Sequence, residues 1–119
     1  MPNENDMPIT QAVHDTFRLD FYKGYISNAI TAMTEDGVNL GAYFAWSLMD
    51  NFEWADGYSV RFGMVYVDYE DNQKRYVKDS LAWYTQFTKT GNINASFVNH
   101  DAIELEKRHA HSKYYQFLE

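Results

Sequence analysis

The chain has 119 residues, of which 45% are hydrophobic and 18% aromatic, and its formal net charge is −7. This composition excludes a disordered or low-complexity protein, and the length allows one domain. The negative charge argues against nucleic acid as a partner, because neutralising phosphates requires clustered Lys and Arg, and the 10 present are scattered.

No apolar run approaches the ~20 residues of a membrane span, and Met1 to Asp6 are neither basic nor apolar as a signal peptide would be. We therefore expect a soluble protein without a membrane partner, and its compartment stays open. The absence of cysteine excludes disulfides, thiol nucleophiles and thiolate metal sites. His109-Ala110-His111 offers only half of a metal site, so we expect neither metal nor cofactor.

The first expected elements are a loop, a helix and a strand. Met1 to Thr10 hold both prolines and several turn formers, which indicates a loop. From Val13 to Met33 apolar residues recur every four positions, which predicts an amphipathic helix that Gly37 ends in a left-handed cap. The almost entirely apolar or small run from Leu40 to Met49 predicts a strand buried on both faces, as in parallel sheets flanked by helices.

The rest of the predicted core is a polar, glycine-containing loop, an extended segment and a second helix. Met64 to Val67 is β-branched and apolar enough to be extended, and Asp68 to Arg75 is polar and turn-like. Lys78 to Thr90 carries apolar residues on one face and is closed by Gly91, which predicts a helix.

The end of the chain differs in composition from the rest. Asn92 to Glu119 is polar and charged and has poor helical periodicity, although Glu104 to Arg108 could form a solvated helix. We expect residues 1–91 to be one structural portion and residues 92–119 a polar C-terminal extension.

The predicted elements do not make a complete fold. A single buried strand leaves unpaired backbone groups on both edges, and a further parallel strand would need a crossover connection of a dozen or more residues. The pattern therefore predicts the last part of a larger α/β fold, in which ligands bind at the carboxyl ends of the strands.

Several motifs carry a family resemblance in the right order. They are Trp46-Ser47-Leu48-Met49-Asp50-Asn51-Phe52-Glu53-Trp54, Gly57-Tyr58, Arg61-Phe62-Gly63, Val67-Asp68 and Ser80-Leu81-Ala82-Trp83-Tyr84, with Asp15-Thr16-Phe17-Arg18 and Asp36-Gly37-Val38 upstream. Together they closely resemble the carboxyl-terminal part of glycoside hydrolase family 1, which contains the β-glucosidases. The resemblance covers about Pro8 to Phe87 and leaves out the tail. It implies the C-terminal part of a (β/α)8 TIM barrel, namely helix 7, strand 8, a long loop and helix 8.

The resemblance also implies which chemistry is absent. Retaining glycosidases use two carboxyl groups about 5 to 5.5 Å apart, as nucleophile and as general acid and base. The family carries them in Ile-Thr-Glu-Asn-Gly and Asn-Glu-Pro motifs, and neither occurs here. Asn3-Glu4-Asn5 lacks the proline, and Asp50 and Glu53 are too close in sequence to flank a glycosidic bond. We therefore expect no catalytic residue in this chain.

Four residues are the substrate-binding candidates that the resemblance implies. Glu53 would bind outer hydroxyls of a sugar, Trp54 would donate its indole N–H, Trp46 would lie beneath the ring, and Phe62 near the exocyclic group. Two of them have a plainer alternative from the residues alone, since Trp46 could cap the barrel core and Glu53 could be a surface loop acid. Asp50 is expected to fix the loop by hydrogen bonds. Arg61 and Asp68 are expected in structural ion pairs, and Tyr58 in packing.

We therefore predict a fragment of a retaining β-glucosidase-like hydrolase, inactive when isolated, that holds a monosaccharide or small β-glycoside. Its partner would be the missing N-terminal barrel portion. One alternative is a non-catalytic sugar-binding or partner-complementing barrel remnant. Another is an unrelated small α/β domain.

Overall fold

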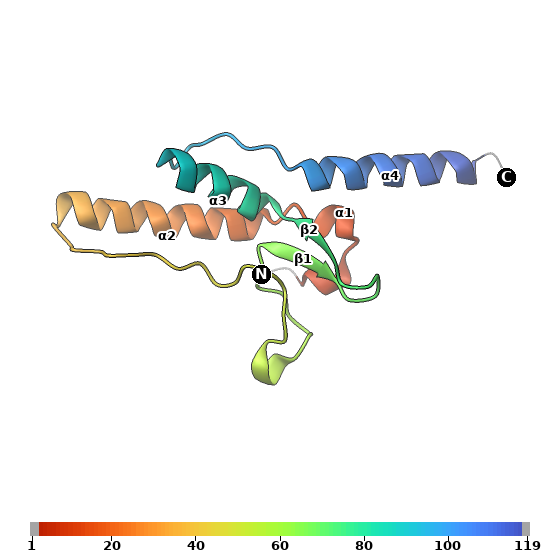
Figure 1. Cartoon of the computed structure of the whole chain (residues 1–119), viewed down its shortest axis with the longest axis horizontal. Helices are drawn as coiled ribbons and strands as arrows, with labels where there is room; N and C mark the ends of the chain where they lie inside the picture. The colour runs from red at the N-terminus through yellow and green to blue at the C-terminus, as the bar shows by residue number, and fades with distance from the viewer. Residues whose placement is uncertain (1–2, 118–119) are drawn as a thin grey trace.

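The computed structural model describes residues 3–117, so Met1, Pro2, Leu118 and Glu119 lie outside the described residues. Figure 1 shows α2 and α3 side by side, with a β-hairpin at one end of the pair and α4 running outward beyond it. In chain order the elements are η1 (Glu4–Asp6), α1 (Ile9–Ala12), α2 (Thr16–Glu35), η2 (Trp54–Asp56), β1 (Val65–Asp68), β2 (Lys74–Val77), α3 (Asp79–Thr90) and α4 (His100–Gln116).

Both helices expected from apolar periodicity are present, and each ends at the expected glycine. Gly37 has φ +68° after α2 and Gly91 has φ +67° after α3, in the left-handed region that favours glycine. The Gly91 N–H donates to the Phe87 carbonyl at 2.8 Å, and the Val38 N–H donates to the Ala32 carbonyl at 3.1 Å. Free carbonyls at the ends of the two helices are thereby satisfied.

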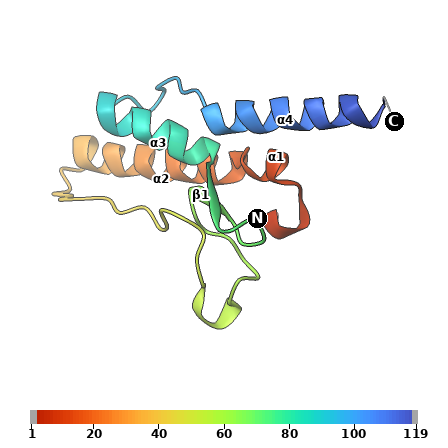
Figure 2. The same ribbon diagram turned by 45° about the vertical axis from the view of Figure 1, so that its right-hand side comes forward.

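The Leu40–Met49 segment corrects the prediction of a strand buried on both faces. It runs back along α2 as extended chain (Figures 1 and 2), and only Met49 forms a bridge, parallel to Val65. Tyr43 and Ala45 pack against the core, whereas Phe44 between them is 90% exposed. The apolar run is correctly extended, but burial on its outer face needs a further layer, which residues 3–117 do not supply.

A hairpin of β1 and β2 replaces the single extended segment that the sequence predicts. The strands are antiparallel, with Val65 opposite Val77 and Asp68 opposite Lys74. Asn72 and Gln73 have positive φ values of 49° and 57° and make the turn. The predicted turn over Asp68 to Arg75 is therefore wrong at its end, because the polar start of β2 carries no alternating apolar signal.

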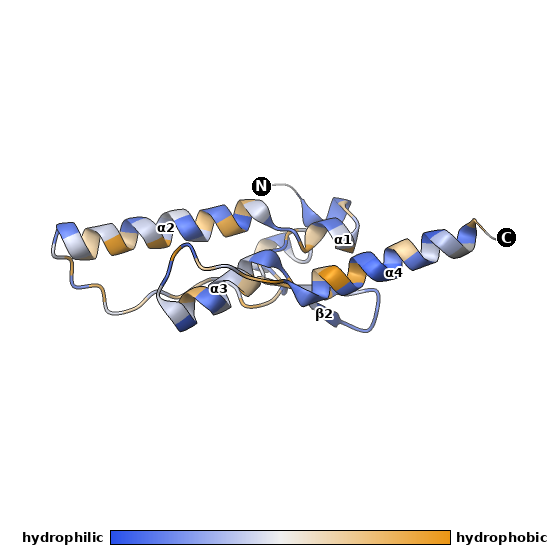
Figure 3. Cartoon of the chain, turned by 90° about the horizontal axis from the view of Figure 1, so that it is seen from above, coloured by the Kyte–Doolittle hydropathy of each residue, from blue (hydrophilic) through white to orange (hydrophobic). Residues whose placement is uncertain are grey.

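The two ends of the chain are more helical than expected. The predicted loop over Met1 to Thr10 contains η1 and the start of α1, and α4 is far longer than the short solvated helix considered in the tail. Tertiary contacts explain α4: the Val77 N–H donates to Asp101 Oδ2 at 2.7 Å, and Ala102 is buried. Figure 3 shows apolar residues in the half of α4 nearest β2 and a mostly polar remainder.

Within residues 3–117, two small apolar clusters form the core. The first joins α1, the hairpin and α4, and the second joins α2, α3 and the start of β1. Trp83 of the second cluster is completely buried, stacks on Phe87 with ring centroids 5.3 Å apart, and donates its indole N–H to the Ile93 carbonyl at 3.1 Å. Among residues 3–117, no helix combines the length and hydropathy that crossing a bilayer requires.

His14 links α4 to the rest of the fold through two carboxylates. Its Nδ1 lies 2.8 Å from Asp79 Oδ2 and its Nε2 lies 3.1 Å from Glu106 Oε1. The hydrogen bond to Asp79 is the main cause that raises the pKa of His14, with a further contribution from Glu106 and opposition from burial. A protonated imidazole donates to both carboxylates at once.

We therefore predict that the His14 contribution to the free energy of unfolding is fully present below pH 6.5, its ordinary pKa, and is lost as pH rises through the raised folded value. His14→Gln should flatten this part of the dependence of stability on pH, measured by urea denaturation across pH 5 to 9. His109→Gln, which changes a histidine of α4 itself, serves as the control. Equal pH profiles for His14→Gln and the unchanged chain would refute the link.

Candidate functional site

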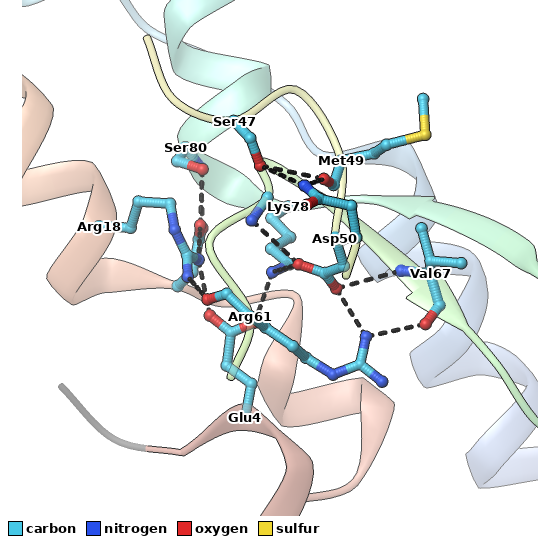
Figure 4. A network of polar contacts seen from close by, with 12 residues as sticks. Glu4, Arg18, Ser47, Met49, Asp50, Arg61, Val67, Lys78 and Ser80 are labelled. Carbon is cyan, nitrogen blue, oxygen red and sulfur yellow. Dashed lines mark hydrogen bonds and ion pairs between the residues drawn. The ribbon is translucent and has the colours of Figure 1, made fainter. Parts of the chain in front are cut away.

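Asp50 anchors the loop that carries the candidate sugar-binding residues. The carboxylate is almost completely buried and is surrounded by donors, as Figure 4 shows. Arg61 Nη1 donates to Oδ2 at 2.6 Å, and Lys78 Nζ donates to Oδ1 at 3.1 Å. The N–H groups of Gly63 and Val67 add bonds of 3.0 and 3.2 Å. One side chain thereby ties both ends of the loop to β1 and to the start of α3.

The ion pairs of Asp50 continue into a buried network that reaches the N-terminus and α2. Lys78 Nζ also donates to Glu4, and Arg18 Nη1 donates to Glu4 Oε1 at 2.6 Å and to Asp15 Oδ2 at 2.7 Å. Ser80 Oγ donates to Asp15 at 2.6 Å. Burial raises the pKa of Asp15, although hydrogen bonds from Ser80 and Arg18 oppose that rise. The acids and bases of this network compensate one another away from water.

The base of the loop requires a glycine at position 63. A Cβ at Gly63 would lie 2.1 Å from the backbone nitrogen of Asp50 and 2.3 Å from the carbonyl carbon of Met49. The Ser47 N–H donates to the Phe62 carbonyl at 3.2 Å, and the Trp46-Ser47 peptide is cis. The hydrogen bond from Ser47 to Phe62 therefore holds Trp46 and Phe62 on two adjacent segments of chain.

The loop that contains η2 projects from the body of the molecule (Figure 2), and Glu53 and Trp54 lie at the start of η2. The Glu53 N–H donates to the Gly57 carbonyl at 2.8 Å, which closes a tight turn around η2, and Gly57 has φ +57°. Glu53 is only 6% exposed, yet within residues 3–117 its Oε1 has no hydrogen-bond partner. Trp54 is 82% exposed. A buried carboxylate oxygen thus retains its full capacity to accept a hydrogen bond.

Trp46 and Phe62 line a hollow of about 380 Å³ against α2. Phe17, Phe21 and Tyr22 supply its other apolar walls. The Tyr22 hydroxyl donates to the Trp46 carbonyl at 2.7 Å, and burial raises the pKa of Tyr22 to about 12. Tyr22 is therefore neutral at physiological pH and fixes the backbone beneath the indole.

The structure brings two of the four candidates together and leaves the other two apart. Trp46 and Phe62 share one hollow, whereas Glu53 and Trp54 are not among the residues that line it. The available chemistry consists of flat aromatic faces and an unoccupied carboxylate oxygen, which suits hydroxyl groups and C–H faces. Asp50 and Glu4 are each held by two cations and so are structural acids.

The expected roles of four further residues can be compared with these contacts. Asp50 does fix the loop, and Arg61 does form a structural ion pair with it. Asp68 instead accepts the N–H groups of Glu70 and Asp71 at 3.1 and 3.2 Å, so the expected ion pair is wrong. Tyr58 packs edge-on against Phe52 and Tyr69. In the part of the chain that the structure describes, no cluster of metal ligands is present.

Sequence reasoning missed most of the buried network. Asp15 and Arg18 lie three residues apart on a helix, which is a recognisable ion-pair spacing, and both belong to a quoted motif. Lys78 and Glu4 are 74 positions apart, and no local pattern connects them. Only the tertiary structure reveals that Lys78 joins Glu4 to Asp50.

The family model and the similar curated proteins point to the same family. The model of glycosyl hydrolase family 1 matches residues 2–93. Beta-glucosidase 30 of Arabidopsis thaliana is 40% identical over 120 residues, which cover 98% of this chain and 20% of that protein. This alignment extends into the tail, beyond the expected limit of the resemblance. Beta-glucosidase 1B of Phanerodontia chrysosporium is 51% identical over 85 residues, 71% of this chain and 16% of that protein.

Solved structures give the same result. The beta-glucosidase from Trichoderma harzianum superposes with a TM-score of 0.64 at 58% identity, over 65% of this chain and 16% of that one. A family 1 beta-glucosidase from Humicola insolens in complex with glucose gives 0.63 at 53% identity, over 65% and 16%. The chain therefore spans about a fifth or less of the length of these relatives.

The buried network generates a stability prediction. Lys78→Met removes the ammonium between Glu4 and Asp50 and leaves uncompensated negative charge, so we expect a loss of about 3 to 5 kcal/mol in the free energy of unfolding. Urea denaturation followed by tryptophan fluorescence measures it. Lys74→Met is the matched control, because Lys74 is half-exposed and lies 4.0 Å from Asp71, and it should change little. Equal losses from both variants would contradict the role of Lys78.

Proposed function

Since the chain belongs to glycosyl hydrolase family 1, we propose that it forms the sugar-holding part of a β-glucosidase-type hydrolase of O-glycosyl bonds. The unpartnered Oε1 of buried Glu53 is the observation that carries this proposal. Buried acceptor atoms without a hydrogen-bond partner are rare in protein interiors, and such an atom is expected to accept from a ligand or a water molecule. A sugar hydroxyl is a donor of that kind, and a hydrogen bond to a carboxylate is stronger than one between neutral groups.

In this proposal, each of the four binding candidates contacts a different part of the sugar. Glu53 accepts outer hydroxyl groups, and the exposed indole of Trp54 donates its N–H to one of them. Trp46 places its ring face under the sugar, and Phe62 lies near the exocyclic group. Two observations support this arrangement: Trp46 and Phe62 share one hollow, and the similar Humicola insolens enzyme has been solved in complex with glucose.

Bond cleavage requires groups that this chain does not contribute. A retaining mechanism needs two carboxyl groups about 5 to 5.5 Å apart, one of them free to attack. Asp50 and Glu4 are occupied by Arg61, Lys78 and Arg18, which leaves them unsuited to that role. The nucleophile and the acid/base therefore come from the remaining part of the barrel, and the isolated chain is inactive.

A second candidate is a non-catalytic barrel remnant that binds sugar or complements a partner chain that supplies the other strands. The outward-facing apolar residues of the Leu40–Met49 segment favour it, because they are available to another polypeptide. Calorimetric titration of the isolated chain with glucose separates the two candidates. A remnant that works alone binds glucose measurably, whereas an incomplete subsite shows no heat of binding.

A chimera tests the main proposal. Residues 2–93 of this chain, the range that the family model matches, replace the corresponding segment of the Trichoderma harzianum enzyme, and hydrolysis of an aryl β-glucoside is measured. We expect activity, and we expect Glu53→Gln in the chimera to lower kcat/KM by about 100-fold, equivalent to about 2.7 kcal/mol. Glu70→Gln, at an exposed acid on the turn after β1, is the control and should leave kcat/KM unchanged.

Two results would overturn the proposal. One is an active chimera in which Glu53→Gln and Glu70→Gln behave alike. The other is turnover of the glucoside by the isolated chain that Glu53→Gln abolishes, because the chemistry would then reside in this chain.

A further inference from the structure

Among residues 3–117, two side-chain atoms are buried without a hydrogen-bond partner, and sugar binding by Glu53 accounts for only one of them. The first atom is Oε1 of Glu53, and the second is the hydroxyl oxygen of Tyr69, which directly follows β1. The two groups are chemically complementary, because a carboxylate oxygen accepts hydrogen bonds and a phenolic hydroxyl can donate one. A buried donor and a buried acceptor that both lack a partner call for a common explanation.

Ring contacts bring Tyr69 against the turn that carries Glu53. The Glu53 N–H donates to the Gly57 carbonyl at 2.8 Å and closes this turn. Phe52 and Tyr58, which flank the turn, pack edge-on with ring centroids 5.4 Å apart. Tyr69 in turn packs edge-on against Tyr58, with centroids 4.8 Å apart. The three rings therefore connect the turn to the end of β1.

A second contact fixes the ring of Tyr69. The guanidinium carbon of Arg61 lies 4.8 Å from the ring centroid, and the same guanidinium donates to Asp50 at 2.6 Å. Burial is the main cause that raises the pKa of Tyr69, and the negative charge of Glu53 adds a smaller contribution. The phenol therefore stays protonated and able to donate, and Glu53 lies close enough to act on it electrostatically.

We propose that Tyr69 is a positioning residue for Glu53, linked to it by one buried water molecule that accepts from the Tyr69 hydroxyl and donates to Glu53 Oε1. Since neither atom has a direct partner among residues 3–117, a single water is the shortest link that satisfies both. Buried waters typically make about three hydrogen bonds to polar groups that would otherwise lack a partner.

The water link is compatible with sugar binding and prepares Glu53 for it. A carboxylate oxygen has two lone pairs, so Oε1 can accept from the water and from a sugar hydroxyl at once. A carboxylate that is already held in one orientation loses less side-chain freedom when the sugar binds. The inference rests on the proposed function in one respect, because the orientation of Glu53 affects catalysis only if Glu53 binds the sugar.

The free 119-residue chain tests the water link without any dependence on activity. Tyr69→Phe keeps the ring and removes only the hydroxyl. A linked hydroxyl stabilises the fold, so we expect the urea midpoint of unfolding to fall by about 0.5 M. Removal of a buried hydroxyl without a partner would leave the midpoint unchanged or raise it. In a Glu53→Ala background, Tyr69→Phe should leave the midpoint nearly unchanged, because the partner is already absent.

Tyr58→Phe is the matched control. Tyr58 belongs to the same group of ring contacts, but it is 56% exposed, so its hydroxyl is open to solvent. Its removal should leave the urea midpoint unchanged.

Kinetics of the chimera with the Trichoderma harzianum enzyme test the positioning role. Tyr69→Phe should lower kcat/KM for the aryl β-glucoside about tenfold, equivalent to about 1.4 kcal/mol. In the Glu53→Ala background the same change should lower it less than about twofold, because the two side chains act as one unit. A residue that merely supports the loop would lower kcat/KM by the same factor in both backgrounds.

Three results would overturn the proposal. They are a urea midpoint that Tyr69→Phe leaves unchanged or raises, equal midpoint shifts from Tyr69→Phe and Tyr58→Phe, and equal kinetic losses with and without Glu53. A kinetic loss without a midpoint shift would mean that Tyr69 contacts the sugar itself. If Glu53→Gln leaves kcat/KM unchanged while the midpoints of the free chain behave as expected, the link between Tyr69 and Glu53 stands and only the proposed sugar-holding role fails.

Discussion

The ammonium of Lys78, completely buried between Glu4 and Asp50, is the interaction on which the rest of the structure depends. A charge of this kind is expensive to remove from water and is tolerated only when its partners are close and well oriented. Here those partners come from the N-terminal segment and from the start of the binding loop, and both also bond an arginine. The network thereby joins separate stretches of chain that the small apolar clusters alone would hold weakly.

The network also determines which acid is available for a ligand. Asp50 and Glu53 are three residues apart and both are buried, but their surroundings are opposite. Asp50 accepts from two cations and two backbone N–H groups, while an oxygen of Glu53 accepts from none among residues 3–117. The first acid stabilises the loop and the second is the candidate for sugar binding, so the two carboxylates of one short motif differ in their availability to a ligand.

Local signals in the sequence predict some of this and tertiary contacts decide the remainder. The 3.6-residue periodicity and the glycines at positions 37 and 91 predict α2 and α3 well, because helix ends depend on neighbouring residues. The Leu40–Met49 run predicts extension correctly but burial wrongly, since burial of its outer face needs a further layer that residues 3–117 do not supply. The second hairpin strand and the full length of α4 escape prediction because polar residues are held there by distant contacts such as that of Asp101 with Val77.

Native-state amide hydrogen exchange of the free chain is the most decisive experiment, because it separates the amides bonded to the buried carboxylates from those of the extended Leu40–Met49 segment. The amides of Gly63, Val67 and Ser80, which donate to the buried carboxylates of Asp50 and Asp15, should be strongly protected. Those from Gly41 to Trp46 should exchange at close to the rate of an unstructured peptide. Equal protection of the two sets of amides would contradict this account. It would mean either that the extended segment is paired in the free chain or that the ion-pair network does not hold the fold together.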